Sequence, residues 1–287
     1  MKYTNKFELP QTVFDAVVEQ EKEHIGADYS VTQLKKGAAE IALTMLHKDE
    51  LERDISDSLN TLLGSAVHSI LASKGNQENA EVYMEYKLDD VVISGTADLL
   101  EDDCTTDYKT CASWKVIYKD FDDWSYQLRA YNFLRLIKTG KLVLKGKIIS
   151  FIKDHSPTQA ERDSSYPQTP IYPIDFTFTK EEILSIPDEW KAKIHDVNEI
   201  IKGNFIPCTE EERWHDPDKW ALMKKGRISA VKLYDSEEEA KAACTDTNLY
   251  VEHRKGKDKK CDKYCDVGRC GFCPYYNETH TKEKENG

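Results

Sequence analysis

Two stretches decide the fold of this chain: Gly95-Thr96-Ala97-Asp98-Leu99-Leu100 and Thr106-Asp107-Tyr108-Lys109-Thr110. Each predicts a β-strand, and the two follow one another in a single meander. Residues two apart on a strand point to the same face, so Asp107 and Lys109 lie side by side. With Asp98 at the end of the preceding strand, we expect its carboxylate to meet that of Asp107 beside the Lys109 ammonium.

This arrangement of charges indicates a metal site with hydrolytic chemistry. Two carboxylates so close repel each other unless a cation lies between them, and Mg²⁺ or Mn²⁺ is the natural occupant because hard divalent ions take oxygen ligands. Lys109 could orient or deprotonate a water molecule and offset the charge that builds up on a phosphate. The parts fit hydrolysis of a phosphodiester. Asp-x-Lys alone is a weak signal, since charged residues on a strand face are usually only solvated.

The surrounding pattern predicts an α/β core with a central mixed sheet flanked by helices. A helix near residues 60–73 is expected to bury the apolar stripe Leu63, Ala66, Val67, Ile70 and Leu71, and the runs 81–87 and 91–100 form a hairpin around Asp89-Asp90. The further predicted elements are a strand at 104–110, a helix at 122–137, a strand at 142–152, an exposed loop at 154–173, a helix at 180–202 that Pro187 kinks or divides, and a small β-α-β pattern at 228–234, 236–243 and 249–253.

Length and composition set the broad class. The chain has 287 residues and a net charge of −12, and no run approaches the roughly 18 apolar residues of a membrane span. The first residues lead into no apolar signal segment, so we expect a cytoplasmic protein of a bacterial or phage-infected cell. We divide the chain into an N-terminal helical region (1–60), a catalytic core (61–205) and a C-terminal appendage (206–287) that carries a cysteine cluster.

A basic stretch lies inside this acidic chain. Residues 124–153 contain seven basic and no acidic side chains, which could form a stripe that attracts phosphate. We expect Arg129, Arg135 and Lys138 to contact DNA. The alternative is a solvated helix face that happens to be basic.

Three residues outside the two strands could join the site. Gln127 and Tyr131 are four apart on the predicted helix and so share one face. His68 lies about 140° around its helix from Leu63, off the apolar stripe on which a core histidine would be expected.

Taken together, the four motifs Gly64-Ser65-Ala66-Val67-His68, Gly95-Thr96-Ala97-Asp98, Asp107-Tyr108-Lys109 and Gln127-Leu128-Arg129-Ala130-Tyr131 come in an order that resembles the PD-(D/E)xK nuclease superfamily. Within it the chain is similar to the RecB-type exonuclease branch, which includes CRISPR-associated and phage nucleases. The resemblance implies a restriction-endonuclease-like core. Ala97 stands where the family name has proline, a replacement that is frequent in this branch.

Carried over onto this sequence, the resemblance implies roles for individual residues. His68, Asp98 and Asp107 would bind the catalytic Mg²⁺ or Mn²⁺, with the Tyr108 carbonyl as a further ligand. Lys109 would be the catalytic lysine, and Gln127 and Tyr131 would position it or the DNA strand. Glu85, on the strand before Asp98, is a further candidate ligand.

The cysteines Cys261, Cys265, Cys270 and Cys273 fall within 13 residues, which indicates one structural metal. A tetrahedral zinc site is one option and an iron–sulfur cluster the other. In the resembling family one cysteine precedes the nuclease motifs, whereas here none precedes Cys104, so zinc ranks slightly ahead. Cys104 and Cys111 are interpreted as buried thiols, and Cys208 and Cys244 are isolated in the sequence.

The sequence thus predicts a metal-dependent DNA exonuclease that leaves 5′ phosphates and acts on linear or single-stranded DNA ends. The resemblance to phage members suggests DNA replication, recombination or end processing, alongside a partner protein. Two alternatives remain open: an endonuclease with the same core, and a non-catalytic nucleic-acid-binding protein that uses the cysteine module and the basic run Arg254 to Lys260.

Overall fold

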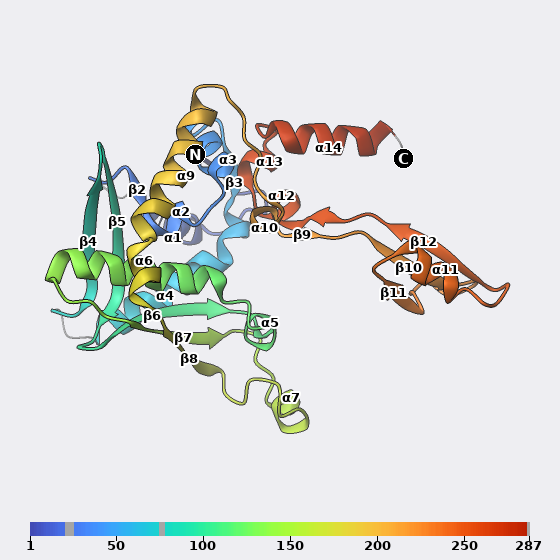
Figure 1. Ribbon diagram of the computed structural model, residues 1–287, viewed down its shortest axis with the longest axis horizontal. Helices are drawn as coiled ribbons and strands as arrows, with labels where there is room; N and C mark the ends of the chain where they lie inside the picture. Colours follow the sequence, from blue (N-terminus) through green and yellow to red (C-terminus); the bar gives the residue numbers. More distant parts are fainter. Residues whose placement is uncertain (21–25, 75–77, 286–287) are drawn as a thin grey trace.

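The computed structural model describes residues 1–20, 26–74 and 78–285. Its centre is a six-stranded sheet in the order β2-β5-β6-β7-β8, with β4 paired to β5 as well (Figure 1). The β2–β5 and β6–β7 pairs are parallel and the others antiparallel, so the prediction of a mixed sheet is confirmed. The strands are β2 (Tyr29–Ser30), β4 (Ala80–Leu88), β5 (Val91–Leu100), β6 (Cys104–Cys111), β7 (Lys145–Ile152) and β8 (Ile171–Thr177).

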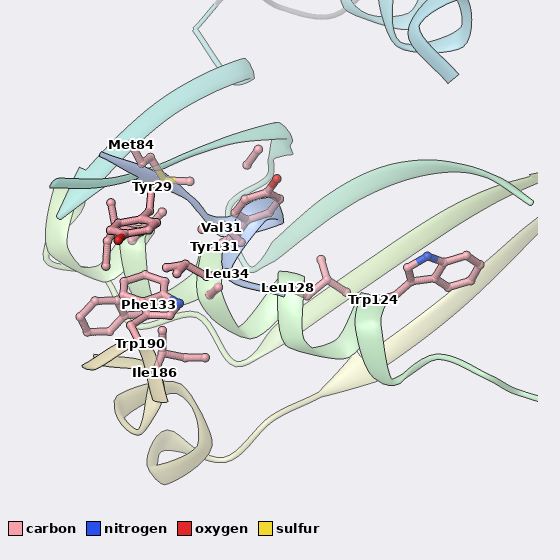
Figure 2. Close-up of a cluster of buried hydrophobic side chains, with 14 of the residues drawn as sticks. Tyr29, Val31, Leu34, Met84, Trp124, Leu128, Tyr131, Phe133, Ile186 and Trp190 are labelled. Atoms are coloured by element: carbon pink, nitrogen blue, oxygen red, sulfur yellow. The ribbon is translucent and has the colours of Figure 1, made fainter. Parts of the chain in front are cut away.

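Helices flank this sheet, and α6 (Asp122–Thr139) packs closest to it. A Cβ added to Gly95 of β5 would lie 2.8 Å from the Tyr131 ring, and one added to Gly146 of β7 would lie 2.9 Å from Leu128. These two glycines therefore let α6 approach the sheet and seat Tyr131 beside it. Figure 2 shows Trp124, Leu128 and Tyr131 of α6 in the core. The other flanking helices are α2 (Val31–Leu34), α3 (Ala38–Leu46), α4 (Leu59–Ala72), α5 (Ser113–Ile117), α8 (Lys180–Leu184) and α9 (Ile186–Ile201).

The sheet opens between β5 and β6. Their ladder is limited to the pairs Leu99–Thr106 and Leu100–Thr105, whereas β4 follows β5 along almost its whole length. Beyond the last pair, Asp98 and Asp107 face each other across the opening. The fold thus brings the two predicted carboxylates together at a place where their strands no longer bond.

The N-terminal residues do not form a core of their own. Tyr29, Val31, Leu34 and Ile41 belong to the same buried cluster as the sheet and α6, and β2 is a strand of the central sheet. The boundary drawn at residue 60 therefore separates no packing unit. The remaining N-terminal elements are β1 (Lys2–Thr4), α1 (Gln11–Gln20), β3 (Glu52–Asp54) and a 3₁₀ helix, η1 (Ile55–Ser58).

Two local predictions were wrong. The predicted apolar stripe of α4 is not in the core: Leu63 is 40% and Ile70 63% exposed, and no residue of this helix is buried. The predicted loop at 154–173 contains α7 (Pro157–Arg162) and the start of β8. Because β8 is the last strand in the sheet order, Pro173 fits there with its missing N–H on the open side.

The C-terminal part consists of a compact base and a projecting arm (Figure 1). The base contains α10 (Glu210–Arg213), β9 (His215–Asp216), β13 (Lys257–Asp258), α12 (Lys259–Lys263), α13 (Asp266–Arg269) and α14 (Pro274–Glu285). The arm holds β10 (Lys219–Lys224), β11 (Lys232–Tyr234), α11 (Glu237–Ala242) and β12 (Leu249–Arg254), so the predicted β-α-β pattern gains a strand. In the described part of the chain, no helix has the length and apolar character needed to cross a bilayer.

Candidate active site

The opening between β5 and β6 carries a buried pair of carboxylates. Asp107 is 1% and Asp98 6% exposed. Asp98 Oδ2 accepts the backbone N–H of Tyr108 at 2.6 Å, a donor that the short β5–β6 ladder does not reach. This hydrogen bond fixes Asp98 against β6. Burial raises the pKa of the Asp107 carboxyl, the nearby Lys109 ammonium opposes that rise, and the charge of Asp98 adds to it.

Lys109 lies next to Asp107, as the strand period predicts. Its Nζ is 2.6 Å from Asp107 Oδ2, so the two side chains form a close ion pair. The side chain of Lys109 stays partly exposed, whereas Asp107 is enclosed. Lys109 can therefore reach a molecule in the site while Asp107 holds its position.

His68 of α4 completes this face. Its Nδ1 lies 3.0 Å from Asp98 Oδ1, and this hydrogen bond raises the pKa of His68 despite partial burial. The structure thus places His68 beside Asp98, although the apolar stripe of α4 from which it was singled out is not buried.

Glu81 is a member of this cluster that the sequence analysis missed. It lies between the Ala80–Leu99 and Val82–Ala97 pairs, opposite Asp98. Ligand atoms of His68, Glu81 and Asp98 all lie within 4.8 Å of one another, which makes them the candidate ligands of one cation. Burial, followed by the charge of Asp98, raises the pKa of Glu81.

Glu85, the predicted extra ligand, lies elsewhere. It pairs with Ser94, four residues along the strand from Glu81, and accepts a hydrogen bond from the Tyr83 hydroxyl at 3.0 Å. Four residues of strand correspond to roughly 13 Å. The structure therefore places Glu81, and not Glu85, beside Asp98. Glu81 also has a left-handed backbone with φ 50°, a strained state for a residue with a Cβ that is often found at functional sites.

Gln127 and Tyr131 of α6 reach the same site from the helix side. Both are buried, and Gln127 Nε2 donates to the Tyr131 hydroxyl at 2.7 Å and, with a longer contact of 3.4 Å, to Asp107 Oδ1. Burial is the main reason that the pKa of Tyr131 is raised far above its usual value. Tyr131 thus remains a neutral hydroxyl that holds Gln127 against Asp107.

Apart from Glu81 and Glu85, the side chains described above line one open cavity of about 230 Å³. Ser30 and Thr32 from the β2–α2 junction and Thr96 from β5 add hydroxyl groups to its wall. The cavity brings together His68, Asp98, Asp107, Lys109, Gln127 and Tyr131, all named from the sequence. It offers carboxylates and an imidazole for a cation, an ammonium for an anion, and hydroxyls for a polar substrate.

The three residues predicted to contact DNA differ in their exposure. Arg135 is 6% exposed and donates to the carbonyls of Glu101, Asp102 and Cys104, so the structure contradicts its assignment to DNA. Arg129 pairs with Glu189 at 2.9 Å, and Lys138 donates to the Tyr83 carbonyl at 2.8 Å. Of the seven cations in residues 124–153, Arg135 is the buried one, whereas Lys138, Lys141, Lys145 and Lys153 are exposed.

Three of the four cysteines predicted to hold a metal lie together with a fourth, Cys208, that was not predicted. Cys261, Cys265 and Cys273 line an enclosed pocket together with Cys208, against Glu40 of α3. Cys270 is absent from that lining, and its Sγ instead lies 3.6 Å from the Glu52 carbonyl. Burial raises the pKa of Cys261 to about 12 and that of Cys265 to about 11, so without a metal both are neutral thiols. Cys104 and Cys111 are buried thiols of β6, as interpreted.

No protein-family model matches the chain, and no curated protein matches it. Solved structures do: SSO0001 shares 19% identity over 64% of this chain and 83% of its own, with a TM-score of 0.45. A candidate exonuclease from Eubacterium rectale shares 14% over 71% and 90%, with a TM-score of 0.43. The alkaline exonuclease LHK-Exo from Laribacter hongkongensis shares 11% over 68% and 95%, with a TM-score of 0.37. Similarities this distant say nothing of the chemistry of this chain, which we argue from its side chains.

Proposed function

We propose that the chain is a divalent-metal-dependent deoxyribonuclease of the exonuclease type, which hydrolyses phosphodiester bonds at DNA ends and leaves 5′ phosphates. The observation that supports it is the facing of Asp98 and Asp107 across the opened sheet, with His68 3.0 Å from the first and Lys109 2.6 Å from the second. A structural ion pair would not need a second buried carboxylate. The corresponding biological role is DNA replication, recombination or end processing.

The donor set fits a hard divalent ion. His68, Glu81 and Asp98 offer one nitrogen and two carboxylate oxygens, and Asp107 adds a buried carboxylate whose Oδ2 contacts the Lys109 ammonium. These four side chains are the ligands that we propose for Mg²⁺ or Mn²⁺, and the Tyr108 carbonyl remains a prediction. When bound, such an ion supplies Lewis-acid polarisation of a phosphoryl oxygen.

The remaining side chains act on the substrate. Lys109 holds a positive charge at the edge of the cavity, where it can orient a water molecule and offset charge on the phosphate. Gln127 fixes Asp107 in the rotamer that faces Asp98, and Tyr131 fixes Gln127. Ser30, Thr32 and Thr96 can donate to phosphate or sugar oxygens.

The decisive experiment compares end-labelled linear DNA with a covalently closed circle of the same sequence. We expect purified protein with Mg²⁺ or Mn²⁺ to shorten the linear DNA and spare the circle, and excess chelator to stop the reaction. Asp107→Asn should abolish hydrolysis, while the matched Asp103→Asn, at an exposed carboxylate paired with Lys145, should retain it.

Each other outcome has a clear meaning. A nicked or linearised circle would replace the exonuclease by an endonuclease with the same site. DNA binding without any hydrolysis would support the non-catalytic alternative. Full activity of Asp107→Asn would remove this cavity from the chemistry.

A further inference from the structure

The arm is a small folded unit of its own. Its strand β10 lies between β11 and β12 in an antiparallel sheet, and α11 packs on that sheet. Ala221, Leu222 and Met223 of β10 and Ala240 of α11 are buried and form its interior. Figure 1 shows the arm reaching away from the central sheet, and the β9–β13 pair closes its base. Such a unit holds a hairpin in place at a distance from the core.

That hairpin, residues 219–234, is the segment of interest. It contains five basic and no acidic side chains in a chain whose net charge is −12. Lys219 is paired with Asp235. The four other cations, Lys224, Lys225, Arg227 and Lys232, form no ion pair with any residue that the structure describes. Arg135 differs from these four cations, because it is buried and donates to backbone carbonyls of the core.

The turn of the hairpin adds an apolar side chain. Ile228, next to Arg227, is 98% exposed. Gly226, with φ +80°, supplies the left-handed backbone that carries the chain around the turn. A fully exposed isoleucine contributes nothing to folding. Apolar side chains presented in this way among cations are used by DNA-binding proteins as wedges between base pairs.

We propose that hairpin 219–234 binds duplex DNA, with Lys224, Lys225, Arg227 and Lys232 on phosphates and Ile228 inserted between base pairs. The inference rests on the proposed function, for which it supplies a DNA-holding surface outside the catalytic cavity. Two-stranded ribbons are among the elements that DNA-binding proteins place in a groove. An acidic protein is the less suitable partner, because lysine is depleted in protein–protein interfaces.

The test measures equilibrium binding of a labelled 30-base-pair duplex at several salt concentrations, in chelator so that no cleavage occurs. We expect K224A/K225A/R227A to bind at least about tenfold more weakly and to lower the slope of log affinity against log salt by about 2 to 3, since each neutralised phosphate contributes roughly 0.9. The matched triple K180A/K191A/K202A changes the charge equally at exposed lysines of α8 and α9 and its C-cap, and should bind like the wild type.

Ile228→Ser tests the wedge. It should weaken duplex binding without changing the salt slope, because no charge is lost. Thermal unfolding of all variants should match the wild type, since every changed side chain is exposed.

The two proposals fail separately. If K224A/K225A/R227A binds duplex DNA with wild-type affinity, the hairpin proposal is overturned, whether or not the protein cleaves DNA. An acidic protein would then be the better candidate partner for the hairpin. Weakened binding in a protein that hydrolyses neither DNA nor a small chromogenic phosphodiester would instead overturn the proposed function and keep the hairpin. Hydrolysis of that small ester by the triple variant should equal the wild type, because its bond can be reached without the arm.

Discussion

The Asp98 carboxylate accepts the backbone N–H of Tyr108 at 2.6 Å, at the place where β5 and β6 part. One oxygen of this side chain therefore replaces a missing strand-to-strand bond, and the other faces His68 at 3.0 Å. Asp98 therefore links β5 to β6 at the edge of the opening and also presents a negative charge there. A substitution can separate these two contributions.

The first prediction concerns that separation. Asp98→Asn retains an oxygen that can accept the Tyr108 amide but loses the negative charge, so we expect near wild-type stability and a loss of hydrolysis of about a hundredfold or more. Asp98→Ala loses both and should also reduce the free energy of unfolding by about 1–3 kcal/mol, because the buried amide is left unpaired. Urea unfolding and a nuclease assay check both. Equal stability of the two variants would show that the hydrogen bond has no structural role.

Glu81 and Glu85 provide a matched pair for the second prediction. They lie four residues apart on the same strand, yet only Glu81 faces His68 and Asp98. Glu81→Gln should weaken Mn²⁺ binding by about tenfold or more, since even groups that only orient metal ligands contribute 10–100-fold. Glu85→Gln should leave it unchanged. Calorimetric titration with Mn²⁺ distinguishes them, and equal affinities of the two variants would exclude Glu81 as a ligand.

The third prediction assigns Arg135 to the fold. Its guanidinium donates to the carbonyls of Glu101, Asp102 and Cys104 at the turn between β5 and β6. Arg135→Leu should therefore reduce the free energy of unfolding by about 1–3 kcal/mol, without changing the salt dependence of DNA binding. The exposed Lys141→Ala is the control, with an expected change within about 0.5 kcal/mol. A weaker salt dependence of DNA binding in Arg135→Leu would instead indicate that Arg135 contacts DNA.

Features set by local sequence were predictable. The hairpin of β4 and β5, the Asp107–Lys109 face and the Gln127–Tyr131 pair follow from strand and helix periods, and the structure has all three. Glu81 was within reach of the same reasoning. A two-residue turn at Asp89-Asp90 pairs Leu88 with Val91, and counting back from that pair places Glu81 opposite Asp98.

Features set by contacts between distant segments were not predictable. The exposure of the α4 stripe depends on which elements happen to cover that helix, and the burial of Arg135 depends on carbonyls of the β5–β6 turn more than 30 residues earlier. The role of Cys208 was hidden for a similar reason. The arm is inserted between Cys208 and Cys261, so the two lie in one pocket without a recognisable spacing in the sequence.

Cys208 is the subject of the last prediction. A Cβ added to Gly37 would lie 2.5 Å from its Sγ, so the absence of a side chain at residue 37 leaves room for this sulfur against the start of α3. There it lines a pocket with Cys261, Cys265 and Cys273. We propose that these four, rather than a set with Cys270, hold the predicted structural metal. Thiolates are the ligands that zinc and iron–sulfur clusters share.

Elemental and sulfide analysis of protein purified without oxygen checks the ligand set and the metal together. We expect a metal, either zinc or iron with acid-labile sulfide, in the wild type and in Cys270→Ser, and none in Cys208→Ser. Cys208→Ser should also unfold at a lower temperature, because binding free energy at such a site becomes folding free energy. One zinc per chain would identify a zinc site, and iron with sulfide would identify an iron–sulfur cluster, with the same ligands in both cases. Metal retained in Cys208→Ser, or lost in Cys270→Ser, would favour the set predicted from the sequence. A wild type without metal would mean that the four thiols have a packing role alone.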